Sequence, residues 1–331
     1  MIQETLMKLI ESFSSLKFWL GTLEQGLIFG IMVLGLYISY KILDFPDMTV
    51  DGAFPMGAGI VGRLLLAGWP PILCLVVAAI GGALAGCVTG ILHVKFKIRD
   101  LLAGILVMTA LYSINLRIMG KSNIHLFGVN HLFTSRKEAL MAKLQGINAS
   151  NSILSFAEEN GDALINIFII LVILLIVKIS LDFLLKTEFG FALRALGDND
   201  KLVVALGINE KRLKIIGLII ANTMVALAGG VLAQQQGFAD VGMGTGTIVA
   251  GLASIILGEG IFKRMKAIKM TTIVLIGSIL YRLTISVALT LGLEATDLKL
   301  VTSVIVVIIL IPKMGLTKLV KRRAGEVNAK N

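Results

Sequence analysis

Charged residues are scarce in this 331-residue chain, at 16% of the total against 56% hydrophobic residues. A soluble protein of this length carries roughly a quarter charged residues. The mean hydropathy of +0.90 therefore excludes an ordinary soluble domain. Several apolar runs instead reach the ~20 residues that an α-helix needs to cross a bilayer. The composition predicts an all-α, polytopic membrane protein.

Cysteines and catalytic patterns are also scarce. Cys74 and Cys87 lie in one apolar segment without the spacing of a metal site. Gly120-Lys121-Ser122 looks like the end of a phosphate-binding loop, but Asn115 stands where that loop requires a glycine. The chain has no Ser/His/Asp, HExxH or CxxC constellation. We therefore expect no catalytic residue, metal site, cofactor or nucleotide site in this chain.

Nine apolar segments are predicted to span the membrane, and the second and seventh of them are short and rich in glycine. The segments are 22–41, 50–67, 70–93, 99–119, 162–185, 213–234, 243–259, 268–292 and 298–312. Together they predict a membrane domain over 22–312. Residues 1–21 mix charged with apolar side chains and contain no small-residue cleavage site, which favours an interfacial amphipathic helix over a signal peptide.

Lysine and arginine predict the orientation of these spans. Basic residues crowd the connectors at 95–99, 186–214 and 263–269 and the tail at 313–331, whereas the long connector at 120–161 is nearly balanced. The positive-inside rule places the basic connectors and the tail in the cytoplasm and 120–161 outside. The N-terminus lies outside with nine spans, or inside if residues 1–20 also insert. The net charge of +10 reflects this asymmetry and does not indicate binding of nucleic acid.

An internal repeat is predicted by two short matches. Phe45-Pro46-Asp47-Met48 and Phe238-Ala239-Asp240-Val241 share the pattern Phe-x-Asp-apolar, and each follows a long span and precedes a short, glycine-rich one. Gly26-Leu27-Ile28 and Gly217-Leu218-Ile219 open those long spans at nearly the same offset. Two inverted repeats with short, interrupted helices in matching positions are typical of a transporter with its path at the repeat interface.

Polar residues in these two stretches are candidates for the path. Irregular backbone and charge persist at membrane depth only where they are buried in protein or line a wet cavity. The alternative is that the acids lie at the membrane surface and Thr49 caps a helix. The predicted path residues are Asp47, Thr49, Asp51, Gln235, Asp240 and Thr245. Mid-span Asn115 and Asn222 are typical of hydrogen bonds between helices, and Arg282 requires a carboxylate or carbonyl partner.

The polar connector at 186–212 is predicted to fold into two short helices. Phe189, Ala192, Leu193 and Leu196 recur at helical spacing and give the first helix an apolar face. Gly197 is expected to end that helix, and a residue of 198–200 to cap the second. Gly207 is expected to end the second helix, and Asn209 to cap the next span. Short capped helices in a membrane protein's connector indicate a docking surface for a soluble partner.

The same connector carries a resemblance to a known family. Gly190-x-Ala192-x-Arg194-Ala195-x-Gly197-x-Asn199, followed by Gly207-Ile208-Asn209, resembles the cytoplasmic loop of ABC importer permeases of the branched-chain amino acid and ribose type. The segments 43–59 and 251–258 are similar to that family's interrupted helix and glycine-rich segment, so the resemblance covers about 22–315. The chain is most similar to the putative tryptophan/tyrosine permease subgroup. Many members read Ala-His-Gly where this chain has 47–52, which argues against branched-chain amino acids as the solute.

The resemblance implies the permease subunit of an importer in the cytoplasmic membrane, which moves a small polar solute, and the subgroup implies an amino acid. The resemblance also implies an ATPase subunit that binds ATP-Mg, an external solute-binding protein, and a second permease that is identical or paralogous. The residues expected to contact the ATPase are Phe189, Gly190, Ala192, Leu193, Arg194, Leu196, Gly197, Asn199 and Gly207. Leu193 and its apolar neighbours would sit in an ATPase groove, and Arg194 would pair there or fold back on Asp198. The alternative function is an ion-coupled secondary transporter.

Overall fold

The computed structural model describes residues 15–134, 151–262 and 268–293, together with Phe13 and five isolated positions beyond residue 293. The predicted tail at 313–331 lies outside these residues. Most of the predicted span at 298–312 and of the predicted interfacial helix at 1–21 also lies outside them.

Long apolar helices form the membrane domain, and seven described segments are long and apolar enough to cross a bilayer. The helix α2 (Leu16–Leu36) continues into a π-helix, η1 (Tyr37–Ile42). The other long helices are α4 (Pro71–Val94), α5 (Asp100–Met119), α7 (Asn151–Leu184), α10 (Glu210–Gln236) and α12 (Met270–Thr290). The seventh segment, Val241–Phe262, joins a 3-10 turn to a shorter helix. The long helices match predicted spans within a few residues, except that α7 begins at Asn151 and not at 162. The external connector predicted at 120–161 is therefore partly helical.

Two short helices, α3 (Val50–Leu66) and α11 (Thr247–Phe262), occupy the predicted positions of the interrupted helices. The segment before α3 runs through the interior of the protein. Asp47 in that segment contacts Asn222, which lies about three turns, or roughly 18 Å, from the start of α10. Consequently α3 begins within the membrane domain and not at its surface.

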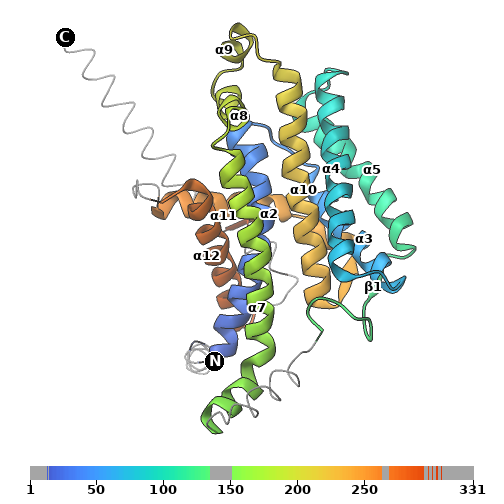
Figure 1. Cartoon of the computed structure of the whole chain (residues 1–331), viewed down its shortest axis with the longest axis vertical. Coiled ribbons are helices and arrows are strands. Elements are labelled where there is room, and N and C mark those ends of the chain that lie inside the picture. The colour runs from blue at the N-terminus through green and yellow to red at the C-terminus, as the bar shows by residue number, and fades with distance from the viewer. Residues whose placement is uncertain are drawn as a thin grey trace, which may run out of the picture.

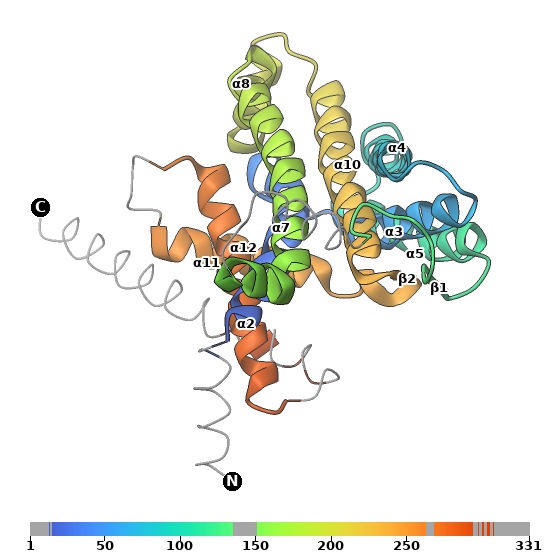
Figure 2. The same ribbon diagram turned by 60° about the horizontal axis from the view of Figure 1, so that its bottom comes forward.

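One small β-ladder corrects the prediction of a purely helical chain. The strands β1 (Asn123–His125) and β2 (Phe238–Asp240) pair antiparallel, with Ile124 opposite Ala239. Both central residues are buried. Figure 2 shows the two strands side by side, after α5 and α10 respectively. The predicted internal repeat places one of its Phe-x-Asp matches in β2.

Two short helices, α8 (Glu188–Asp198) and α9 (Asp200–Ala205), lie at one end of the helical bundle in Figure 1, opposite β1. A cavity there is lined by residues from the segment before α3, the end of α4 and the start of α9, including Asp44, His93 and Lys201. The positive-inside rule predicts that this end is cytoplasmic, and we call it the cytoplasmic end below.

Glycines bring α3 and α10 into backbone contact near the centre of the domain. A Cβ added at Gly57 would collide with the carbonyl of Ala226, and one added at Gly229 would collide with the carbonyl of Phe54. Small residues of this kind let membrane helices approach closely, because packing replaces the hydrophobic driving force inside a bilayer. In addition, α10 packs against α4 and α2, so this helix lies at the core of the fold.

Candidate functional site

The cytoplasmic connector folds into two short capped helices, which confirms the pattern read from the sequence. Thr187 caps α8 by accepting a hydrogen bond from the Gly190 amide at 3.3 Å. Asn199 caps α9 through the Leu202 amide at 3.2 Å, and Asn209 caps α10 through the Arg212 amide at 3.2 Å. Gly197 does not end α8, which continues to Asp198.

The predicted apolar face of α8 points into the protein and not toward a partner. Leu193 and Leu196 are 0% and 4% exposed, and Phe189 and Ala192 pack partly buried against the same core. Gly197 lies against the carbonyl of Ile42 so closely that a Cβ would collide with it. The expectation that Leu193 and Leu196 insert into an ATPase groove is therefore wrong in this conformation. These residues instead anchor α8 to η1 and α10.

Several exposed apolar side chains on α8, on α9 and directly after α9 were missed by the helical-periodicity argument. Phe191, Leu202, Val204 and Leu206 are 61%, 51%, 53% and 66% exposed. Large apolar side chains left exposed on a polar connector indicate a surface that a partner could cover. We call these four residues the cytoplasmic patch.

Arg194 bonds to the end of α7 and does not fold back on Asp198, while its predicted pairing with an ATPase stays a prediction. Its guanidinium donates to the backbone carbonyl of Leu185 at 2.7 Å and lies 5.6 Å from the ring of Phe191. Leu185 directly follows the last residue of α7, where the helix dipole favours a cation. Arg194 thus joins α8 to the end of α7.

Asp51 links the two short membrane helices, α3 and α11, at their N-termini. It lies in the first turn of α3 and accepts hydrogen bonds from the Gly246 amide at 3.0 Å and the Ile248 amide at 2.9 Å. The hydroxyl of Thr247 donates to the same carboxylate at 2.9 Å. A carboxylate in this position stabilises the positive ends of both helix dipoles. One acid from the first half of the chain therefore caps the short helix of the second half.

Asp47 and Thr49 are fully buried, and neither lines the cavity beside Asp51 that is described below. Asp47 accepts from the Asn222 amide group at 2.7 Å and from the Thr49 backbone amide at 2.9 Å. The Thr49 and Thr89 hydroxyls lie 2.7 Å apart. Placing Asp47 and Thr49 on an open path is therefore wrong for this conformation, because both tie α3 to neighbouring helices.

A cavity of about 430 Å³ brings two of the predicted path residues together. Asp51 and Thr245 line it with Tyr112, Ser113 and Asn115 of α5, which the sequence did not single out as path residues. The Asn115 amide donates to the Gly52 carbonyl at 3.1 Å, as expected of a polar contact between helices. Tyr112 and Ser113 are exposed, which is unusual for polar residues on a membrane helix unless they face water or protein.

Gln235 and Asp240 lie elsewhere. The side chain of Gln235 hydrogen-bonds to Glu24, a buried carboxylate of α2 that also bonds to Asn166. Asp240 accepts from the Gly242 amide at 2.7 Å and caps a 3-10 turn, η2 (Val241–Gly244). Neither residue lines the cavity beside Asp51.

Arg282 has an aromatic partner that the sequence did not reveal. Its guanidinium carbon lies 3.2 Å from the centre of the Phe29 ring, and one nitrogen donates to the Gln25 side chain at 3.3 Å. A cation over a ring face is stabilised most where water is excluded. The amide carbonyl of Gln25 is thus the predicted carbonyl partner, and the Phe29 ring is an additional one.

Comparison with known proteins gives these features a context. One relative is the tyrosine transport system permease protein of Clostridioides difficile (strain R20291). It is 47% identical over 288 residues, which are 87% of this chain and 88% of that protein. An uncharacterized protein of Rickettsia prowazekii (strain Madrid E) is 34% identical over 290 residues, which are 86% of this chain and 94% of that protein.

A probable branched-chain amino acid transport permease protein of Methanocaldococcus jannaschii is 28% identical over 207 residues, 62% of either chain. No solved structure matches the chain at a significant level. A family model described as branched-chain amino acid transport system / permease component matches residues 18–311. The chain therefore belongs to this family of transport permeases.

Proposed function

We propose that this chain forms the membrane path of an ATP-driven importer for tyrosine or a closely related amino acid. The observation that carries the proposal is the 47% identity to a permease named for tyrosine transport, which extends over almost the whole membrane domain. The chain itself supplies no ATPase chemistry. ATP-Mg binds to a partner subunit, and an external binding protein delivers the solute.

The ATPase docks on the cytoplasmic patch. Phe191, Leu202, Val204 and Leu206 offer apolar surface to it, while Asn199 and Gly207 shape the turns around α9. The buried residues Leu193 and Leu196 then transmit its movement inward, because they fix α8 against η1 and α10. Close backbone contacts at Gly190 and Gly197 and the bond from Arg194 make α8 rigid relative to α7 and η1.

The solute path runs beside α5 and the junction of the short helices. The exposed polar side chains Thr109, Tyr112 and Ser113 face a second permease copy, identical or paralogous, across that path. Two inverted repeats would match α2 with α10 and α4 with α12. The packing of the helices supports this match, because α2 packs against α12 and α10 packs against α4. The span predicted from the sequence at 298–312, most of which lies outside the described residues, would complete the second repeat.

The test uses the full chain extracted gently from native membranes. We expect a stoichiometric partner with a phosphate-binding loop to co-purify, and expect Phe191→Ser with Leu202→Ser to remove it while the chain stays folded. Phe127→Ser is the matched control, because Phe127 is 84% exposed at the opposite end. Uptake of tyrosine into vesicles by the chain alone, under an ion gradient without ATP, would favour the secondary transporter, which family membership does not favour.

A further inference from the structure

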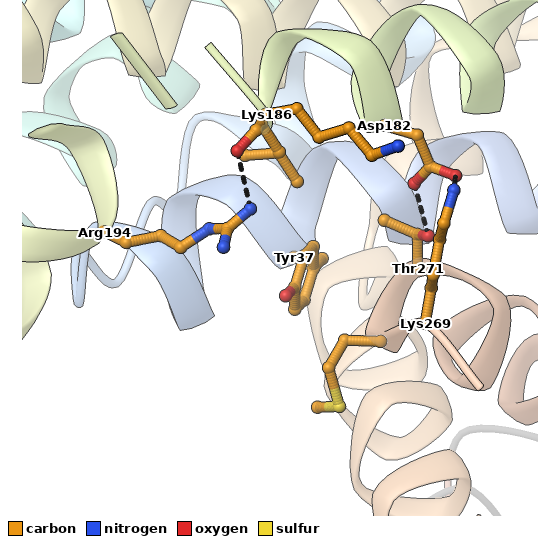
Figure 3. A pocket seen from close by; sticks show the side chains of 8 residues that line it. Tyr37, Asp182, Lys186, Arg194, Lys269 and Thr271 are labelled. Carbon is orange, nitrogen blue, oxygen red and sulfur yellow. Dashed lines mark hydrogen bonds and ion pairs between the residues drawn. The ribbon is translucent and has the colours of Figure 1, made fainter. Parts of the chain in front are cut away.

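A basic cavity of about 460 Å³ lies at the cytoplasmic end, between η1, the end of α7, α8 and the start of α12. Figure 3 shows its polar walls. The polar side chains that line it are Tyr37, Asp182, Lys186, Arg194, Lys269 and Thr271. The proposed transport mechanism does not use this cavity.

One carboxylate in the cavity is already saturated with donors. Asp182 accepts from Lys178 and Lys269, each at 2.9 Å, and from the Thr271 hydroxyl at 2.6 Å. The nearby buried Glu259 pairs with Lys41 at 3.0 Å. Asp182 therefore pairs with Lys178 and with Lys269 of the cavity, Glu259 pairs with Lys41, and no ion pair among the described residues involves Lys186 or Arg194.

The cations retain donors that a bound anion could use. Arg194 has five N–H groups, and only the bond to the Leu185 carbonyl is assigned. An ammonium has three, so Lys269 can serve Asp182 and a second acceptor. Lys186 is exposed and makes no ion pair with the acids that the structure describes. Guanidinium and ammonium groups are the usual partners of a phosphate group, and three such side chains line this one cavity.

The start of α12 adds backbone donors to the same cavity. Met270 and Thr271 form its first turn and line the cavity wall. This helix of 21 residues has no side-chain cap at its N-terminus. The amides of an uncapped first turn and the positive end of the helix dipole attract anions. The helix end and the cations therefore point to the same ligand charge.

The neighbouring face of α7 is apolar and open to the bilayer. Ile176, Ile179 and Phe183 are 62%, 63% and 71% exposed. Ile179 lies three residues before Asp182, on the adjoining side of one helix. A molecule with a phosphate group in the cavity could therefore lay hydrocarbon chains along α7. Basic pockets between membrane helices on the cytoplasmic side bind anionic lipid headgroups by this arrangement.

We propose that this cavity binds a phosphate group, supplied by the headgroup of an anionic lipid or by a free phosphate. Lys186, Lys269, Arg194 and the first turn of α12 hold it. Because Arg194 belongs to α8, the bound phosphate ties the cytoplasmic helices to α12 and α7. Occupancy of the cavity would then set how firmly α8 is held during transport.

The test measures thermal unfolding of the purified full-length chain in mixed micelles. Phosphatidylglycerol is expected to raise the midpoint by about 5 °C over phosphatidylcholine alone, as a ligand of the folded state does. Lys186→Gln should remove at least half of that shift, and Lys186→Gln with Lys269→Gln nearly all of it. Each shift is taken against the same variant in phosphatidylcholine, so a general loss of stability does not count.

Lys95→Gln is the matched control, since Lys95 is an exposed cytoplasmic lysine outside the cavity, and it should keep the full shift. Inorganic phosphate is added in a second arm, with chloride replacing it at constant ionic strength. Protection by inorganic phosphate, lost in Lys186→Gln, would support the site with a soluble ligand, and protection by the lipid alone would support the headgroup. Equal protection of wild type and the double variant, or no protection by either anion, would overturn the proposal.

Discussion

Two segments lead into the short helices, 45–49 into α3 and 238–246 into α11, and they differ in where their acids lie. Asp47 is fully buried and ties its segment to α10 through Asn222. Asp240 is partly exposed, and its carboxylate accepts a hydrogen bond from the Gly242 amide in its own turn. The same Phe-x-Asp pattern therefore serves as a tether between helices in one half and as a local cap in the other.

The side chain of Asp51 holds the two segments together at the start of α3 and α11. It belongs to the first short helix, yet its carboxylate bonds to the amides of Gly246 and Ile248 and to the Thr247 hydroxyl, which open the second. Gly244 lies against the Asp51 carbonyl at the same place. The junction is thus held by one side chain and one close backbone approach, and movement of one short helix must reach the other.

The largest effect is expected at the close approach. Gly244→Ala would place a Cβ against the Asp51 carbonyl and the Pro55 ring. Because the contact is with backbone, the two helix ends must separate, at a cost of about 3 kcal/mol or more. Transport should be lost, and the thermal midpoint in detergent should fall.

Gly260→Ala is the control for this change, because no atom lies within 4 Å of a Cβ at Gly260 in α11. It should be neutral or slightly stabilising, since alanine has the higher helix propensity. If both variants unfold at the wild-type temperature, the two short helices are not in contact at Gly244.

Asp51→Ala should have the next largest effect. It leaves the Gly246 and Ile248 amides without their acceptor, and losing a charged cap of this kind costs about 2 kcal/mol. Asp51→Asn keeps one acceptor oxygen and should recover part of the loss. The readout is the thermal midpoint together with ATP-driven tyrosine uptake. A wild-type midpoint for Asp51→Ala would contradict the role of this carboxylate as a cap.

Asp47 and Asp240 give the direct comparison between the halves. Asp47→Ala should cost about 1 kcal/mol, because lost hydrogen bonds are partly offset by removing a charge from the protein interior. Asp240→Ala should cost less than about 0.5 kcal/mol, since it lies near the surface and loses one local bond. Both are measured as thermal midpoints. Equal losses would mean that the two segments do the same work, contrary to their burial.

The long helices and the capped connector could be predicted, because they depend on local patterns. Apolar length marks the spans, and the side chains of Asn199 and Asn209 mark helix starts wherever the chain lies. The direction in which α8 faces could not be predicted, because an apolar stripe looks the same whether it packs on the chain itself or on a partner. Leu193 and Leu196 were placed on a partner for this reason.

The junction of the short helices was beyond prediction for a different reason. The bond from Asp51 to Thr247 spans most of the membrane domain in sequence, and no local pattern encodes such a contact. Asp51 and Thr245 could be selected as polar residues in glycine-rich segments, but Asp47 and Thr49 met the same criterion and are buried. The ladder of β1 and β2 is only three residues long per strand and carries too little periodicity to detect.

The smallest effect on stability is expected for side chains that line the cavity beside Asp51. These variants distinguish residues that contact the solute from residues that hold α3 and α11 together. Ser113→Ala and Thr245→Val remove hydroxyls from exposed positions, so stability should change by less than about 0.5 kcal/mol. Each is expected to raise the KM for tyrosine uptake a few-fold, because one lost hydrogen bond to the solute is worth about 1 kcal/mol. Thr109→Ala serves as a comparison with these two variants. The Thr109 hydroxyl already donates to the Ile105 carbonyl within α5, so its removal should change the KM less. If Ser113→Ala and Thr245→Val leave uptake unchanged while Asp51→Asn impairs it, the junction matters only as a mechanical link, and the solute passes elsewhere.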